Sequence, residues 1–174
     1  ATLQVKQNGD TLVVGEDSLP LKKPFEINFT IPEMDSLQKA QSFIGKISQN
    51  GKAYFLSTKK EDNRWVGKSK SLGEFVVSRD SIAPKIVPLN FKNEQWLSNY
   101  SFLKFKIEDD YTGIKSYRGE INGEWILLEY EPKNNTLIFD FSDLDFEQAL
   151  HEVTIEAEDS VGNKTTFAID FYRK

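Results

Sequence analysis

The sequence predicts an all-β protein made of two tandem immunoglobulin-like or fibronectin-like antiparallel β-sandwich domains. Three observations predict this: a string of residues recurs in both halves, apolar residues alternate with polar ones, and turn dipeptides separate the alternating runs. A chain of 174 residues suits one domain or two. The repeat favours two domains of about 85 to 90 residues each, which we place at residues 1–82 and 83–174.

The repeat joins FIGKI at residues 43–47 with YRGEI at residues 117–121, and an Asn-Gly pair follows each copy. Further along, the run from Leu72 to Ser81 resembles the run from Leu150 to Ser160. Between the halves, Pro84 keeps Ala83 out of the helical region of backbone space. We therefore expect the domain boundary in a short connection near this proline.

Alternation with a period of two dominates the chain, as in strands that bury one face of an antiparallel sheet. In the second half it predicts seven strands, near residues 86–91, 101–107, 114–121, 124–130, 136–141, 151–158 and 164–172. Residues 34–41 are the one helix candidate, and the matching segment in the second half, residues 108–113, predicts a loop. Seven short strands in a unit of this size are typical of a sandwich.

Asn-Gly pairs at Asn8-Gly9, Asn50-Gly51 and Asn122-Gly123 predict type I′ hairpin turns, because both residues tolerate a positive φ. The second half ends in a strand at residues 165–172, whereas the first half runs directly into the connection. The corresponding position in the first sheet is therefore either filled by the N-terminal hairpin, residues 3–14, or left open.

Composition excludes several classes of protein. The formal net charge is −5, without a basic stripe, which argues against nucleic acid as a partner. No apolar run is long enough to span a bilayer, and residues 1–6 alternate like a strand rather than a signal peptide. The absence of cysteine excludes disulfides and thiolate metal sites.

Few residues are candidates for chemistry. His151 is the single histidine, and at the start of a strand we interpret it as a surface residue rather than a zinc ligand. Carboxylate pairs such as Glu129 with Glu131, or Asp140 with Asp143, are expected by chance in an acidic chain. We therefore expect no catalytic residue, no metal ligand set and no cofactor.

Two acidic turns allow one alternative. Calcium prefers six to eight oxygen ligands from such loops. The residues that could supply them are Asp109, Asp110, Asp159 and Asn163. Asp and Asn are also the usual turn formers, and neither turn has EF-hand spacing, so we expect turns rather than an ion site.

The aromatic segment Glu124–Tyr130 gives the best functional indication. Its alternation puts Ile126, Leu128 and Tyr130 on one side and Trp125 with Leu127 on the other. Whichever set faces away from the core could pack against another domain, bind a partner or stack on a sugar ring. The remaining alternative is that a twisted strand buries parts of both sides.

The second half also resembles a known family. The residues that carry the resemblance are Gly113-Ile114, Tyr117-Arg118-Gly119, Asn122-Gly123-Glu124-Trp125, His151, and the turn Asp159-Ser160-Val161-Gly162-Asn163. Together they resemble the C-terminal immunoglobulin-like region of certain bacterial lysostaphin-type zinc metallopeptidases. In those proteins a peptidoglycan-cleaving domain precedes such domains, but its His-x-x-x-Asp and His-x-His zinc motifs have no counterpart here.

The resemblance implies a non-catalytic positioning or binding module that is secreted, periplasmic or on the cell surface. Its expected partners are cell-wall glycan or peptide, or an attached peptidase domain. A carbohydrate-binding module and an adhesin-type protein-interaction module are the alternatives.

Overall fold

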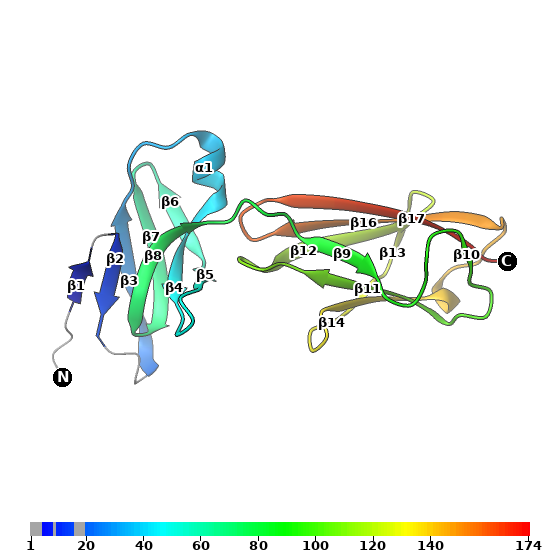
Figure 1. Cartoon of the computed structure of the whole chain (residues 1–174), viewed down its shortest axis with the longest axis horizontal. Helices are drawn as coiled ribbons and strands as arrows, with labels where there is room; N and C mark the ends of the chain where they lie inside the picture. Colours follow the sequence, from blue (N-terminus) through cyan, green and yellow to red (C-terminus); the bar gives the residue numbers. More distant parts are fainter. Residues whose placement is uncertain (1–4, 9, 16–19) are drawn as a thin grey trace. The chain divides into compact units, whose positions relative to one another are not determined.

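The computed structural model describes residues 5–8, 10–15 and 20–174, and it is built almost entirely from antiparallel β-strands. The chain divides into two compact units, Ala1–Ser81 and Ile82–Lys174. Each unit is a β-sandwich of the immunoglobulin-like or fibronectin-like type, as predicted (Figure 1). The expected turn at Asn8-Gly9 and the start of the N-terminal hairpin include residues that lie outside the described ranges.

The first unit contains eight strands and one helix among its described residues. They are β1 (Val5–Asn8), β2 (Thr11–Val14), β3 (Pro20–Thr30), α1 (Ser36–Gln41), β4 (Ser42–Ile47), β5 (Ala53–Leu56), β6 (Thr58–Glu61), β7 (Arg64–Ser71) and β8 (Gly73–Arg79). One sheet has the order β1-β2-β8-β4-β5, and the other has the order β3-β7-β6. The core between them includes Ile27, Ile44, Trp65 and Phe75, each no more than 1% exposed.

The second unit contains nine strands and a short 3-10 helix. They are β9 (Lys85–Pro88), β10 (Gln95–Trp96), β11 (Phe102–Glu108), β12 (Ile114–Ile121), β13 (Glu124–Ile126), β14 (Glu129–Glu131), β15 (Thr136–Asp140), η1 (Phe141–Asp143), β16 (Leu150–Asp159) and β17 (Lys164–Tyr172). Its sheets have the orders β10-β17-β16-β12-β13 and β14-β15-β11-β9. Both sheets contribute to one core, which includes Leu103, Phe105, Ile155 and Phe171.

One predicted strand is in fact two. Residues 124–130 form β13 in the five-stranded sheet and β14 in the four-stranded sheet, so the chain changes sheets between Ile126 and Glu129. The side chains of Ile126 and Leu128 are both buried in the core at this crossing. A continuous alternating pattern can therefore pass through a change of sheet without a turn residue.

The Asn-Gly turns differ from one another. Asn122 and Gly123 have φ values of 53° and 81°, as the predicted type I′ turn requires. At the other pair only Gly51 has a positive φ, 79°, so the type I′ prediction for Asn50-Gly51 is wrong. Here Gly51 N–H donates to the Ser48 carbonyl, and Ser48 N–H donates to that of Lys52, which closes a wider loop. Loop length, which the dipeptide does not encode, decides the turn type.

The hairpin of β1 and β2 fills the position that the sequence left open. β2 pairs antiparallel with β8 at the place where β17 pairs with β16 in the second unit. No helix among the described residues has the length and apolar character needed to cross a membrane.

Candidate functional site

His151 is not a surface residue, contrary to the sequence-based interpretation. Its side chain is 3% exposed and packs between Phe146 and Phe171, with ring centroids 4.8 and 5.3 Å away. Nδ1 lies 2.9 Å from the Asn122 side-chain nitrogen, and Nε2 lies 2.7 Å from the Gln148 carbonyl oxygen. Phe146 from the loop before β16 and Phe171 from β17 cover the ring. Both ring nitrogens therefore serve the packing of this unit.

Asp109 organises the loop between β11 and β12. One carboxylate oxygen, Oδ1, accepts hydrogen bonds from the backbone N–H groups of Tyr111, Thr112 and Gly113, at 3.1, 2.8 and 2.6 Å. The other oxygen, Oδ2, is buried and has no hydrogen-bond partner among the described residues. The carboxylate thus replaces the backbone acceptors that a strand or helix would have supplied.

Asp159 has the same function in the turn between β16 and β17. It is fully buried, and its Oδ1 accepts hydrogen bonds from Val161 N–H and Asn163 N–H, both at 2.9 Å. The Asn163 side-chain amide donates to the other oxygen at 2.7 Å. Asp109 and Asp159 each present a carboxylate oxygen within 4.8 Å of the other.

The structure brings three of the four calcium candidates together and leaves the fourth, Asp110, exposed. Asp109 and Asp159 are neighbours, Asn163 donates its amide to Asp159, and Asp110 is exposed. The hydrogen bonds of Asp109, Asp159 and Asn163 are those of turn-forming residues. The calcium hypothesis stays a prediction that metal titration can test.

Asp140, a member of one carboxylate pair in the acidic chain, is held by its neighbours in the ionised form. Asp140 accepts hydrogen bonds from the backbone and hydroxyl of Ser142, which lower the pKa of its carboxyl group. A general acid in a glycosidase needs a pKa that is raised. Asp140 is therefore a helix-capping residue, at the start of η1.

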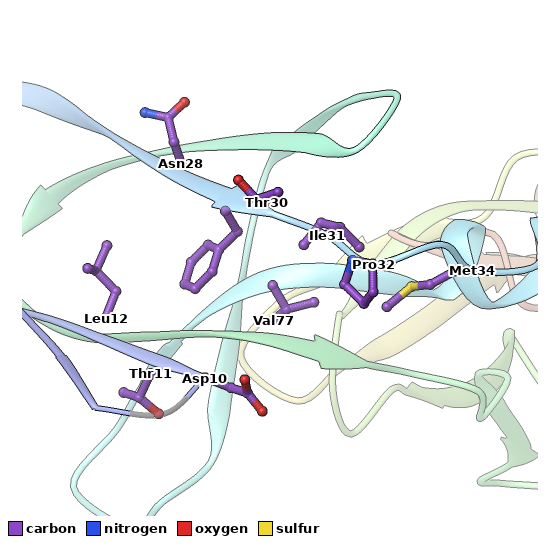
Figure 2. A pocket seen from close by; sticks show the side chains of 10 residues that line it. Asp10, Thr11, Leu12, Asn28, Thr30, Ile31, Pro32, Met34 and Val77 are labelled. Carbon is purple, nitrogen blue, oxygen red and sulfur yellow. The ribbon is translucent and has the colours of Figure 1, made fainter.

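The first unit contains a hollow of about 440 Å³ between its sheets. Figure 2 shows side chains from β2, β3, β8 and the segment after β3 around it. The lining is mainly apolar, with Leu12, Ile31, Met34 and Val77 among its members, and Asp10 is its one titratable residue.

Among the described residues, one strand of the second unit has no counterpart in the first. In the second unit β9 pairs with β11 and places Ile86, 5% exposed, in the core. The counterpart of β11 in the first unit is β3, which among the described residues pairs only with β7. The edge that β9 closes in one sandwich is therefore open in the other.

Trp125 and Leu127 lie on the side of the chain away from the core. They are 59% and 51% exposed, whereas Ile126 and Leu128 between and beyond them are 4% and 5% exposed. Trp125 is opposite Glu120 of β12, at the edge of the five-stranded sheet. The alternatives in which Trp125 is a core residue are thereby removed.

A second exposed aromatic group lies at the other edge of this sheet. Trp96 of β10 is 59% exposed, and its ring stacks on Tyr172 of β17 with centroids 5.2 Å apart and an angle of 24°. Leu150 of β16, 49% exposed, is directly opposite Tyr172. Their neighbours His151 and Phe171 point into the core, so these three side chains share the outward side of the sheet.

We call this outward side of the sheet β10-β17-β16-β12-β13 the outer face. In register order it carries Trp96, Tyr172 and Leu150, then Asp170 and Glu152, then Ala168, Thr154, Glu120 and Trp125, and finally Thr166, Glu156 and Arg118. Four residue steps along the strands and four strand spacings across them separate Trp96 from Trp125, about 20 to 25 Å. The two tryptophans therefore lie on the opposite edge strands of this face.

Some acidic side chains of the outer face form ion pairs with described cations and others do not. Arg118 contacts Glu120 at 2.8 Å, and Lys115 and Lys164 contact Glu158 at 2.6 and 3.3 Å. Hydrogen bonds from these two lysines lower the pKa of Glu158. In contrast, Glu152 and Asp170 stand directly opposite each other on β16 and β17, and no ion pair joins either to a described cation. Like charges in this position destabilise a sheet.

Sequence reasoning identified Trp125 and Leu127 but missed Trp96, Tyr172 and Leu150. Trp96 lies in a strand of two residues, which is too short to produce an alternating pattern. The available signal was Tyr172 in the last strand, because its neighbour Phe171 is apolar and only one of the two can face the core.

No protein-family model matches the chain, and no curated protein matches it. Among solved structures, it is similar to the fibronectin(III)-like modules of Clostridium thermocellum CbhA, with 13% identity and a TM-score of 0.41, over 99% of this chain and 94% of that one. It is also similar to the Clostridium perfringens spore cortex lytic enzyme SleM, with 18% identity and a TM-score of 0.34, over 67% of this chain and 37% of that one. Both TM-scores are low, so the sandwich fold rests on the strand pairing described above.

Proposed function

We propose that this chain is a non-catalytic tandem immunoglobulin-like module of a secreted or cell-envelope bacterial protein, and that it positions a peptidoglycan-cleaving metallopeptidase domain on the cell wall. The observation that carries the binding part is the outer face, with Trp96 and Trp125 exposed on its opposite edge strands. Large exposed aromatic side chains on one surface mark contact sites.

The state of the polar groups supports the non-catalytic part. The imidazole of His151 is enclosed by aromatic rings and hydrogen-bonded at both nitrogens. The carboxylates of Asp109 and Asp159 hold backbone N–H groups in turns. These groups stabilise loops of the second unit, and the resemblance to lysostaphin-type tails supplies the enzyme context.

Co-sedimentation of the full chain with purified peptidoglycan sacculi tests the binding part. We expect the chain to pellet with the sacculi while the turbidity of the suspension and the zinc content of the dialysed protein stay at blank levels. Failure to pellet would refute wall binding. Lysis together with near-equimolar zinc would refute the non-catalytic assignment, because three protein ligands normally hold a catalytic zinc. Recovery of one stoichiometric protein from an envelope extract without sacculus binding would instead favour the adhesin alternative.

A further inference from the structure

We propose that the outer face of the second unit binds a linear glycan that carries free amino groups, such as a partly de-N-acetylated glucosamine polymer. This inference rests on the proposed function and names the chemistry of its ligand. The sugar rings stack on the Trp96–Tyr172 pair, and an ammonium group lies between the carboxylates of Glu152 and Asp170.

The Trp96–Tyr172 pair has the form that a sugar ring needs. Trp96 stacks on Tyr172 through one face of its indole and is still 59% exposed. The C–H faces of a pyranose pack on such a ring as other flat apolar groups do. Leu150, opposite Tyr172, widens the apolar area on the same side of the sheet.

The two carboxylates next to this pair point to a cation. Glu152 and Asp170 are two residues along the strands from Leu150 and Tyr172 on the same face, about 7 Å away. Their mutual repulsion decreases when a positive group lies between them. An ammonium group at that place also lies beside aromatic rings that attract cations.

The rest of the face suits the continuation of a sugar chain. Thr154 and Glu120 provide hydrogen-bonding groups level with Trp125, and Arg118, which contacts Glu120, lies two residues further along β12. A shallow hollow of about 410 Å³ follows, lined by Ser116, Glu156 and Thr166 among other polar residues. This face has polar groups between two exposed aromatic groups. It therefore suits an extended sugar chain better than a folded protein, because a protein–protein interface has an apolar centre.

Charge decides which glycan fits. The acidic side chains on this face are Glu120, Glu152, Glu156, Glu158 and Asp170, and the basic ones at its polar end, Lys115, Arg118 and Lys164, form ion pairs with Glu120 or Glu158. Glu152, Glu156 and Asp170 form no ion pair among the described residues, and such carboxylates repel polyanions and attract amines. A cationic amino-sugar chain is therefore favoured over an anionic polymer.

Isothermal titration of the full chain with three matched oligosaccharides tests the inference: glucosamine, N-acetylglucosamine and glucose oligomers of equal length and linkage. We expect the glucosamine oligomer to bind at least about five-fold tighter than the other two, since about 1 kcal/mol for a pair of exposed charges corresponds to about that factor. The preference should shrink as salt is added. Equal binding of all three oligomers would overturn the proposal.

Variants locate the site. The pair Glu152→Gln with Asp170→Asn should abolish the preference for the free amine, and Trp96→Ala should weaken binding of the glucosamine oligomer about ten-fold. Tyr54→Ala is the control, because Tyr54 is 56% exposed but lies on β5 of the first unit, so this variant should bind like the wild type. Trp96→Phe, which keeps a ring, should restore most of the affinity. Unchanged affinity in Trp96→Ala would overturn the proposal.

A lysine oligomer separates the two kinds of cationic partner. If it binds as tightly as the glucosamine oligomer and depends equally on Trp96, the site recognises a basic peptide and the proposal is wrong. Sacculi that retain wild type and Trp96→Ala equally would also refute this site, but they would leave the proposed wall binding intact.

Discussion

The two units build equivalent five-stranded sheets from opposite ends of their own sequences. In the second unit β17 follows β16 in the chain and pairs with it, whereas in the first unit β2 precedes β8 and takes the same place. β4 and β12 then occupy equivalent positions next to β8 and β16. The comparison teaches that pairing partners define a position in the sheet, and that chain order can change around them.

The repeat matches best in β4 of the first unit and β12 of the second, but these two strands turn different residues of the repeat toward their cores. Ile44 is fully buried in the first core, so its neighbour Gly45 faces the opposite side of β4. A Cβ atom on Gly119 would instead lie 2.5 Å from Leu128 Cδ1, in the second core. Gly45 and Gly119, which occupy the same place in the repeat, therefore lie on opposite sides of their strands.

The largest loss of stability is expected at Trp65 of the first unit, in contrast to the exposed tryptophans of the second unit. Trp65 is fully buried, so Trp65→Ala should destabilise the first unit by about 3 to 5 kcal/mol. Thermal unfolding of the full chain, followed by residue-resolved amide exchange, would assign the loss to the first unit. Trp65→Phe should cost less, because Nε1 has no hydrogen-bond partner among the described residues. Equal protection in wild type and Trp65→Ala would contradict the core assignment.

The next effect contrasts the connections after β3 and β11. Asp35 caps α1 through one hydrogen bond to Gln38 N–H, at 2.7 Å, whereas Asp109 accepts three backbone N–H groups. Asp35→Ala should therefore cost about 1 kcal/mol and Asp109→Ala about 2 to 3 kcal/mol. Urea denaturation gives both values. A larger loss at Asp35 would mean that the loop is held by something other than Asp109.

Thermal unfolding of the wild type with and without calcium tests the calcium hypothesis. We expect millimolar calcium to leave the melting temperature of the wild type unchanged, since backbone N–H groups occupy Oδ1 of both Asp109 and Asp159. A rise that disappears in Asp109→Asn would show that the pair binds the ion, because a ligand specific to the native state stabilises it.

A smaller effect compares the Asn-Gly turns. Gly123→Val and Gly51→Val should each cost about 1 to 3 kcal/mol, because both glycines have a positive φ that a β-branched residue avoids. A Cβ atom meets nothing within 4 Å at either position, so backbone strain alone acts. Replacing Asn50 and Asn122 by Val sharpens the comparison: only Asn122→Val should add strain, since only Asn122 shares the positive φ. Equal losses at both asparagines would refute two different turn types.

The smallest effect is expected at Trp125. Because its side chain is 59% exposed, Trp125→Ala should change the stability of the second unit by less than about 1 kcal/mol. Chemical denaturation measures this change, with Trp65→Ala as the buried counterpart. A loss comparable to that of Trp65→Ala would show that the indole is a core residue and not part of an exposed face.

Much of the fold could be predicted from the sequence, because alternation and turn residues act locally. The all-β class, the helix near Ser36 and the turn at Asn122-Gly123 are all observed. Burial of His151 depends on Phe146 and Phe171, and the second is distant in sequence, so no local pattern reveals it. The outer face likewise joins residues from five strands, and only their register brings Trp96 beside Tyr172 and Glu152 opposite Asp170.

The position of β2 also affects the order in which the units can be completed during synthesis. Every strand of the first unit has left the ribosome once β8 has emerged, because the partner of β8 on that side was made earlier. β16 must wait for β17, and until then its edge presents unpaired backbone groups. A nascent or cleaved chain that ends in the turn at residues 160–163 therefore has all the described strands of the first unit and a second unit in which the edge of β16 can pair with another chain.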